Sequence, residues 1–380
     1  MNRDQAQHLL DDLLQNFATS RFGKQVVMAV EAPVHAFRWT GVLGAAEANE
    51  SITASTPFFI ASIDKLYNTT IAMMLVERGK LDLERSICSY LPEELTRGLH
   101  QYGGRDLTTS ITVRHLLTHT SGLPDWFEDY PKGGDCLAET VFKEGDRVLP
   151  IVELVDYVRH RLKPHFVPQD LSGKRPRIRY SDTNFILLAS IIETVTGEPL
   201  RVVHESMLYD PFGLHETYFY GTYQEEKVQV PSMVLRANGE PLRIPLLLQS
   251  VKSIYSTVDD MMRFVRLLMA GEIYENPETL SAMTNHWRRF GFPMDRAALR
   301  SPNWPIEYAM GMMRFHVPRL FAPCKPIPAV LGHTGSTGCW LFYCPALDVT
   351  LAGSVEDAAA GAVPFRLVPQ ILQRLMRAGC

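Results

Sequence analysis

The sequence has no excess of charge of either sign. Its 38 Lys and Arg residues stand against 42 Asp and Glu residues, for a net charge of −4, and there is no long basic run. Binding to nucleic acid through phosphate neutralisation is therefore not expected. Glycine and proline, at 25 each in 380 residues, are too few for a fibrous or low-complexity protein, and a hydrophobic content of 46% argues against disorder. The chain is predicted to be a large globular protein.

Long apolar runs are missing as well. No stretch reaches the roughly 18 uninterrupted apolar residues that a membrane span requires, so no membrane partner is expected. A helical period near the start is formed by Leu9, Leu10, Leu13, Leu14 and Phe17, and acidic residues interrupt it. This pattern is typical of an amphipathic helix and not of a secretory leader. We therefore predict a cytoplasmic protein.

Signatures of metal and nucleotide sites are absent from the sequence. The six cysteines form no CxxC pair and have no metal-like spacing to histidine, which is typical of reduced thiols in the cytosol. HExxH, a P-loop and a dinucleotide glycine fingerprint are all lacking. Neither a metal ion nor a cofactor is predicted.

The order of periodic segments predicts an α/β (α+β) fold. Two strands are expected within residues 24–46, a helix over 62–79, a mainly helical middle third, further strands near the C-terminus and a final helix over 365–379. A sheet built from both chain ends, about 1–90 and 250–380, with a helical lobe inserted at about 91–249, fits this order. The 380 residues are predicted to form one catalytic domain.

The most informative segment contains Ser62 and Lys65. A serine that opens a helix lies near the positive end of the helix dipole, where backbone N–H groups can bind an oxyanion. Lys65 follows three residues later, about one turn on, over the same face. An amine so placed can accept the serine proton if its pKa is lowered. By itself Ser-x-x-Lys is a weak signal, because an N-cap serine before a solvated lysine gives the same pattern.

Two later segments strengthen the signal. Tyr180-Ser181-Asp182 stands at the head of a helical run, and the stretch 331–338, which contains His333, is punctuated by glycine before a strand-like segment. Ser-x-x-Lys, Tyr-Ser-Asp and His-Thr-Gly, in this order, resemble the serine β-lactamase and penicillin-binding protein superfamily on its class C-like side. That branch includes family VIII carboxylesterases, D-amino-acid peptidases and acyltransferases. The flanking segments 111–124 and 253–268 are similar too, so that the resemblance covers roughly residues 24–375.

The resemblance implies a β-lactamase-like antiparallel sheet flanked by helices, and a role for each matching residue. Ser62 would be the acylated nucleophile, Lys65 its base partner and Tyr180 a second proton carrier. His333 takes the place of the lysine in Lys-Thr-Gly, and the backbone N–H groups of Ser62 and Ser336 would form the oxyanion hole. Each such donor contributes about 10²–10³ in rate and a positioned base about 10²–10⁴.

One departure from the family pattern concerns Asp182, which stands where asparagine is usual. An ionised aspartate only accepts hydrogen bonds, and beside Lys65 it would hold the lysine protonated. Either Asp182 points away from the site, or the charge pattern suits a substrate unlike a β-lactam. Replacing lysine by His333 also weakens recognition of a substrate carboxylate. Both changes favour an esterase, amidase or acyltransferase over a β-lactamase.

Four further residues are predicted to bind substrate: Trp126, Tyr255, Thr334 and Gly335. Trp126 and Tyr255 are chosen because family-like loops carry them near the cleft, although aromatic residues are more often core. His119 is interpreted as a structural histidine that bonds a turn. Cys339 faces either the site or the core, and nothing supports it as a nucleophile.

The leading functional hypothesis is a serine hydrolase that forms an acyl-enzyme on Ser62 with an ester or amide of a small intracellular metabolite. An acyltransferase that passes the acyl group to an amine or alcohol acceptor is the first alternative. A β-lactamase and a non-catalytic ligand-binding homologue are the others, since fold alone does not fix function.

Overall fold

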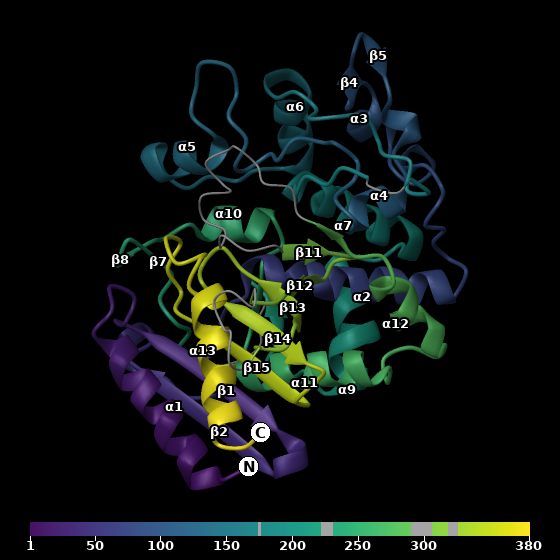
Figure 1. Ribbon diagram of the computed structural model, residues 1–380. Coiled ribbons are helices and arrows are strands. Elements are labelled where there is room, and N and C mark those ends of the chain that lie inside the picture. The colour runs from purple at the N-terminus through teal and green to yellow at the C-terminus, as the bar shows by residue number, and fades with distance from the viewer. Residues whose placement is uncertain (174–175, 222–230, 290–305, 318–325) are drawn as a thin grey trace.

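The computed structural model describes residues 1–173, 176–221, 231–289, 306–317 and 326–380. In these ranges, one antiparallel sheet runs through the molecule in the order β10-β11-β12-β13-β14-β15-β1-β2 (Figure 1). Its strands are β1 Val26–Ala32, β2 Phe37–Leu43, β10 Arg288–Arg289, β11 Ile306–Tyr308, β12 Met313–Phe315, β13 Val330–Thr334, β14 Trp340–Cys344 and β15 Val349–Ser354. Because β1 pairs with β15, placing Met28 opposite Gly353, the sheet joins the two ends of the chain as predicted.

Strand β1 explains why the sheet is buried on both faces. Successive side chains of a strand point to opposite sides. Val26, Met28 and Val30 pack in the cluster that contains the apolar faces of α1 (Arg3–Ala18) and α13 (Pro364–Arg377). Val27 and Ala29 belong to the cluster that contains α2 (Asp64–Glu77) and α11 (Val258–Ala270). Helices therefore cover both faces of the sheet.

The two chain termini lie together at one end of the sheet, where α1 and α13 run side by side (Figure 1). The backbone N–H of Asn2 donates to the carbonyl of Ala378 at 2.7 Å, and the Arg374 guanidinium donates to the carbonyl of Leu9. This pairing of N- and C-terminal helices closes the α/β part of the fold.

The segment between the two halves of the sheet is mainly helical, as predicted. Its helices are α3 Glu93–Thr96, α4 Val113–Leu117, α5 Leu137–Glu144, α6 Ile151–Arg161, α7 Asp182–Thr196, α8 Leu200–His204, α9 Asp210–Phe212 and α10 Pro245–Ser250, and α12 spans Pro277–Thr284. Short hairpins are formed by β4 Gln101–Tyr102 with β5 Arg105–Asp106 and by β7 Arg236–Ala237 with β8 Glu240–Pro241. A small sheet joins β3 Phe58–Phe59, β9 Ile254–Ser256 and β6 Tyr218–Phe219. The proposed lobe boundaries stay predictions.

Helix α2 lies between the main sheet and the helical region (Figure 1). Every residue from Lys65 to Leu75 is buried, so α2 has no solvent face in its first three turns. It ends near the predicted position, where Gly79 adopts a φ of 65°, the left-handed conformation that favours glycine. The N-terminus of α2 lies where the main sheet and the helical region meet (Figure 1).

Two properties expected from the sequence concern membranes and thiols. Across the described ranges, the structure contains no helix long and apolar enough to cross a membrane. Free thiols are found at Cys88, Cys136, Cys339, Cys344 and Cys380. Cys324 lies outside the described residues.

Candidate active site

Ser62 lies in a tight turn, Ala61–Ile63, that leads directly into α2. Ala61 has a φ of 45°, a conformation uncommon for a residue with a Cβ and often found at functional sites. The helix proper begins at Asp64, two residues later than predicted, because the chain enters it through this turn. Ser62 lines a cavity of about 1050 Å³, and residues of the helical region form part of the cavity wall.

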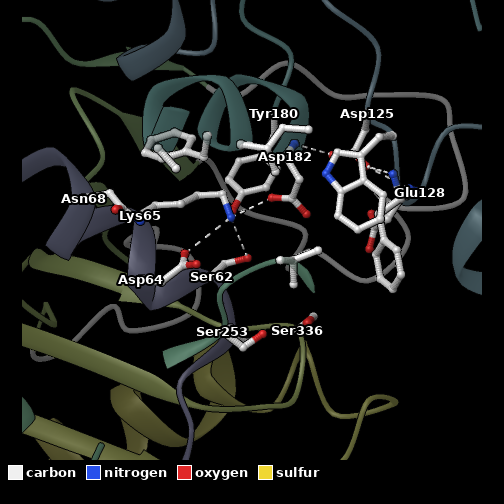
Figure 2. Close-up of a pocket in the computed structure, with 18 of the residues that line it drawn as sticks. Ser62, Asp64, Lys65, Asn68, Asp125, Glu128, Tyr180, Asp182, Ser253 and Ser336 are labelled. Atoms are coloured by element: carbon white, nitrogen blue, oxygen red, sulfur yellow. Dashed lines mark hydrogen bonds and ion pairs between the residues drawn. The ribbon is translucent and has the colours of Figure 1, made fainter. Parts of the chain in front are cut away.

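The Lys65 side chain reaches back to Ser62, as the spacing predicted. Its Nζ donates a hydrogen bond to Ser62 Oγ at 3.2 Å. The same Nζ lies 2.6 Å from Asp182 Oδ1 and 3.8 Å from Asp64 Oδ1. Figure 2 shows both carboxylates directed at the ammonium group, with Ser62 beside it. Asp182 therefore faces the site, and the alternative that it points away is wrong.

These contacts fix the charge of Lys65. Burial alone would lower the pKa of Lys65, but the carboxylates of Asp182 and Asp64, together with Tyr180, outweigh it and raise the pKa well above its ordinary value. Burial raises the pKa of Asp64 to about 6, although Lys65 opposes the rise. The resting site thus holds an ammonium group that is ion-paired with Asp182.

Tyr180 stands just before α7 and lines the same cavity. The Lys65 Nζ lies 5.2 Å from the centre of its ring. Burial raises the pKa of Tyr180 far above its usual value, while the Lys65 charge and hydrogen bonding to Ser62 oppose the rise. The phenol is therefore protonated in the resting state and can act as a proton donor.

Two buried side chains fix the backbone around Tyr180. Asp125 Oδ2 accepts from the backbone N–H of Asp182 at 2.6 Å, and its Oδ1 accepts from two further backbone N–H groups. His119 Nδ1 accepts from the backbone N–H of Ser181 at 3.1 Å and from the amide of Asn184 at 3.0 Å. The interpretation of His119 as a structural histidine is confirmed.

His333 lies behind Tyr180 and is not among the cavity-lining residues. Its Nδ1 is 2.7 Å from the carbonyl of Thr334 and is therefore the protonated nitrogen, so its Nε2 accepts from the Tyr308 hydroxyl at 3.3 Å. Burial, aided by the charge of Lys65, lowers the pKa of His333 to about 3. His333 is thus neutral and lies outside the cavity lining, and its predicted place in the acid/base set stays a prediction.

The predicted oxyanion-hole segment packs against the nucleophile turn. Thr334, Gly335 and Ser336 all line the cavity beside Ser62. A Cβ on Gly335 would lie 2.2 Å from Cys339 Sγ and 2.7 Å from the Cβ of Ala61, so only glycine fits there. Cys339 Sγ in turn donates to the carbonyl of Ile60 at 3.1 Å, which assigns this cysteine to the core. Ser62 and Ser336 are thereby held at one wall of the cavity.

The two aromatic residues predicted to bind substrate differ in position. Trp126 is buried but lines the cavity. Tyr255 is not part of the lining, and its role in substrate binding stays a prediction. It is paired across strands with Phe59 and Tyr218, and its ring stacks on theirs at centroid distances of 5.9 Å. The Tyr255 ring is therefore packed between aromatic neighbours.

Several cavity-lining polar residues were not predicted from the sequence. They include Asp64, Asn68, Asp125, Glu128 and Ser253, which Figure 2 labels. The adjacency of Asp64 to Lys65 in the Ser-x-x-Lys segment was a usable signal. Ser253 opens the family-like segment 253–268, whereas nothing in the local sequence marked Asn68. Among the residues that the structure describes, no group of three or more His, Cys, Asp and Glu side chains is placed to hold a metal ion.

The fold and the site agree with the comparison to known families. The Beta-lactamase family profile matches residues 10–362, and the chain belongs to this family. The superfamily resemblance and the β-lactamase-like fold predicted from the sequence are thereby confirmed.

Similar proteins are found among curated sequences and solved structures. Putative penicillin-binding protein PbpX of Bacillus subtilis is 27% identical over 224 residues, 58% of this chain and 48% of that protein. The D-alanyl-D-alanine-carboxypeptidase/endopeptidase AmpH of Escherichia coli is 26% identical over 75% of this chain and 66% of its own length. The D-amino acid amidase from Ochrobactrum anthropi has a TM-score of 0.71 at 20% identity, covering 99% of both chains. The matched region thus spans about half to two thirds of these curated relatives, and the structural likeness shows the fold alone.

Proposed function

We propose that this protein is a serine hydrolase that forms an acyl-enzyme on Ser62 with an ester or amide of a small metabolite. The observation that carries the proposal is the contact of Lys65 Nζ with Ser62 Oγ, at 3.2 Å, inside a cavity large enough for a substrate. The names of related proteins, which include an amidase and a carboxypeptidase, support acyl transfer chemistry.

The ion pair between Lys65 and Asp182 provides a route for the serine proton. A buried ammonium-carboxylate pair is costly because both charges are desolvated, so transfer of the proton over 2.6 Å to Asp182 is within reach when substrate excludes water. The neutral Lys65 amine then takes the proton of Ser62 as its Oγ attacks the carbonyl carbon. In this proposal Asp182 is the proton acceptor and Lys65 remains the direct base.

Collapse of the tetrahedral intermediate needs an acid. Tyr180, a neutral phenol beside Ser62, gives its proton to the departing alcohol or amine, and Lys65 returns a proton to Tyr180. Water then attacks the acyl-enzyme by the reverse sequence, releasing the acid and restoring Ser62. The backbone N–H groups of Ser62 and Ser336 would stabilise the oxyanion in both half-reactions.

The charges at the site argue against a substrate that needs a carboxylate-binding cation near Ser62. Lys65 is already paired with Asp182, and His333, which replaces the family lysine, is neutral and buried. These features favour a plain ester or amide over a β-lactam.

An acyltransferase is the second candidate. The cavity volume, about 1050 Å³, is at the upper end of the range for small-molecule sites and leaves room for an amine or alcohol acceptor beside the acyl group.

The test is intact-protein mass spectrometry after mixing with an activated short-chain ester. The wild type is expected to gain the mass of one acyl group, and Ser62→Ala is expected to gain none. Clearance of the adduct by water identifies a hydrolase, and clearance only on addition of an amine or alcohol identifies an acyltransferase. An adduct of equal yield on Ser62→Ala would refute the nucleophile assignment, and the absence of any adduct would favour a ligand-binding protein.

A further inference from the structure

One face of helix α7 forms a continuous wall of the cavity. The α7 residues that line it are Asp182, Phe185, Ile186, Ala189, Ser190 and Glu193. Their spacing of three and one residues is that of a single helical face. With a rise of 1.5 Å per residue, the distance along the helix from Asp182 to Glu193 is about 16 Å. The cavity therefore extends well beyond the reacting groups, and we call this extension the α7 arm.

The α7 arm is polar at its ends and apolar between them. At one end Asp182 contacts Lys65, and at the other Glu193 forms an ion pair of 2.6 Å with Lys252. Between these ends, apolar side chains from other elements complete the lining: Leu154 of α6, Leu200 of α8, Leu242, Ile244 before α10, and Leu247 and Leu248 of α10. Such a lining suits an apolar ligand group, since every buried methylene is favourable by about 0.8 kcal/mol.

The middle of the α7 wall carries the two smallest side chains of that face. Ala189 and Ser190 lie between the bulky pair Phe185 and Ile186 and the charged Glu193. A larger side chain at either position would project into the arm. Ala189 and Ser190 are therefore the positions at which the usable length of the arm is set.

We propose that the α7 arm binds the apolar part of the acyl group, so that the substrate is an ester or amide of an extended apolar acid. This inference rests on the acyl-enzyme function proposed above. The acyl group stays attached to Ser62 while the leaving group departs and water enters, so the arm, whose apolar lining side chains are mostly buried, suits the part that stays.

The experiment measures kcat/KM for p-nitrophenyl esters of acetic, butyric, octanoic and dodecanoic acid. With the leaving group constant, each added methylene that enters the arm is expected to raise kcat/KM by up to about four-fold. A second series keeps the acetyl group and lengthens the alcohol. A preference that follows alcohol length and not acyl length would overturn the proposal.

Substitutions in the α7 arm test whether the preference for long acyl groups arises there. Ala189→Phe and, as a less buried alternative, Ser190→Phe are expected to lower the ratio of dodecanoyl to acetyl kcat/KM by at least ten-fold. Thr194→Phe is the matched control, because Thr194 lies on the same helix, is exposed and does not line the cavity. Unchanged ratios in both cavity variants would rule out the arm as the acyl site. Acetyl transfer to Ser62 without any length preference would refute this inference alone, whereas no transfer from any ester would refute the proposed function itself.

Discussion

Two carboxyl groups, those of Asp182 and Glu356, differ in a way that separates chemistry from support. Asp182 lies 2.6 Å from the Lys65 ammonium, and its side chain is 25% exposed to the cavity. Glu356 is fully buried behind the oxyanion-hole segment, where its neighbours are hydroxyl and backbone N–H groups. Burial raises the pKa of Glu356 to about 8, against the effect of these hydrogen bonds.

The surroundings of Asp182 and Glu356 explain why the two carboxyl groups have different roles. A carboxylate in contact with an ammonium group can exchange a proton with it, whereas a neutral, buried carboxyl group holds its hydrogen-bonding partners in place. Glu356 contacts the backbone N–H of Phe59 at 3.2 Å and the hydroxyl of Thr337 at 3.2 Å. It therefore ties the strand before the nucleophile turn to the loop that contains Ser336. The following predictions test this division of roles.

Removing the Lys65 ammonium group should have the largest effect on the rate of acylation. Lys65→Met takes away the direct base and leaves Asp182 without its partner, so the rate of acyl-adduct formation is expected to fall by about 10³-fold or more. The measurement is single-turnover mass spectrometry with an activated ester. Lys143→Met, which removes an exposed lysine paired with Asp135 at 2.6 Å, is the control and should leave the rate unchanged. Near wild-type acylation by Lys65→Met would remove Lys65 from the mechanism.

Neutralising Asp182 should alter the pH profile. In the wild type the proton acceptor is already present within the ion pair, so the acylation rate should stay nearly flat between neutral pH and the ordinary pKa of lysine, because Asp182 holds the pKa of Lys65 above that value. Asp182→Asn removes the carboxylate that raises the Lys65 pKa, and the rate should then increase with pH as free amine forms. A flat profile in both proteins would contradict the role of Asp182. The same variant should react faster with a β-lactam if the acid excludes it.

The burial of Glu356 predicts that the free energy of unfolding depends on pH. A carboxyl group whose pKa is raised from 4.5 to about 8 on folding contributes stability that is fully present below pH 4.5 and is lost as the pH rises through 8. The free energy of unfolding should therefore fall by up to about 1.4 kcal/mol per pH unit in this window. Glu356→Gln keeps a donor and an acceptor and should remove this part of the slope.

Urea unfolding at pH 5, 6, 7 and 8 measures this slope, with Glu198→Gln, at an exposed glutamate, as control. Cys339 and Tyr255 are among the ionisable groups that interact electrostatically with Glu356. Burial raises the pKa of both side chains, so neither is charged between pH 5 and 8. Parallel wild-type and Glu356→Gln curves would show that Glu356 is ionised in the folded protein.

The smallest effect is expected at Asp64. It lies 3.8 Å from Lys65 Nζ, farther than Asp182, and its raised pKa of about 6 means that it loses its charge as the pH falls below that value. Wild-type acylation should change by less than about three-fold around pH 6, and Asp64→Asn should lack this change. A loss as large as that in Lys65→Met would instead make Asp64 a principal member of the site.

Much of the fold was accessible from sequence because its signals are local. The nearly continuous apolar run of β1, the alternation in β2 and the helical period of α13 reflect side chains that face a core directly. The Ser62–Lys65 contact was accessible for the same reason, since one helical turn fixes it. The positions of Tyr255 and His333 were not accessible in this way, because each depends on residues distant in the chain. Tyr255 packs against Phe59 and Tyr218, and His333 contacts Tyr308.

The sequence by itself therefore determined the family, the alternation of strands and helices, and the placing of Ser62 beside Lys65, each of which rests on signals within short segments. Only the tertiary structure decided the charge of that lysine. Asp182, 117 positions from Lys65 in the chain, comes within 2.6 Å because Asp125 and His119 fix the backbone at the start of α7. A pKa is set by burial and by nearby charges in space, and neither can be read from spacing along the chain.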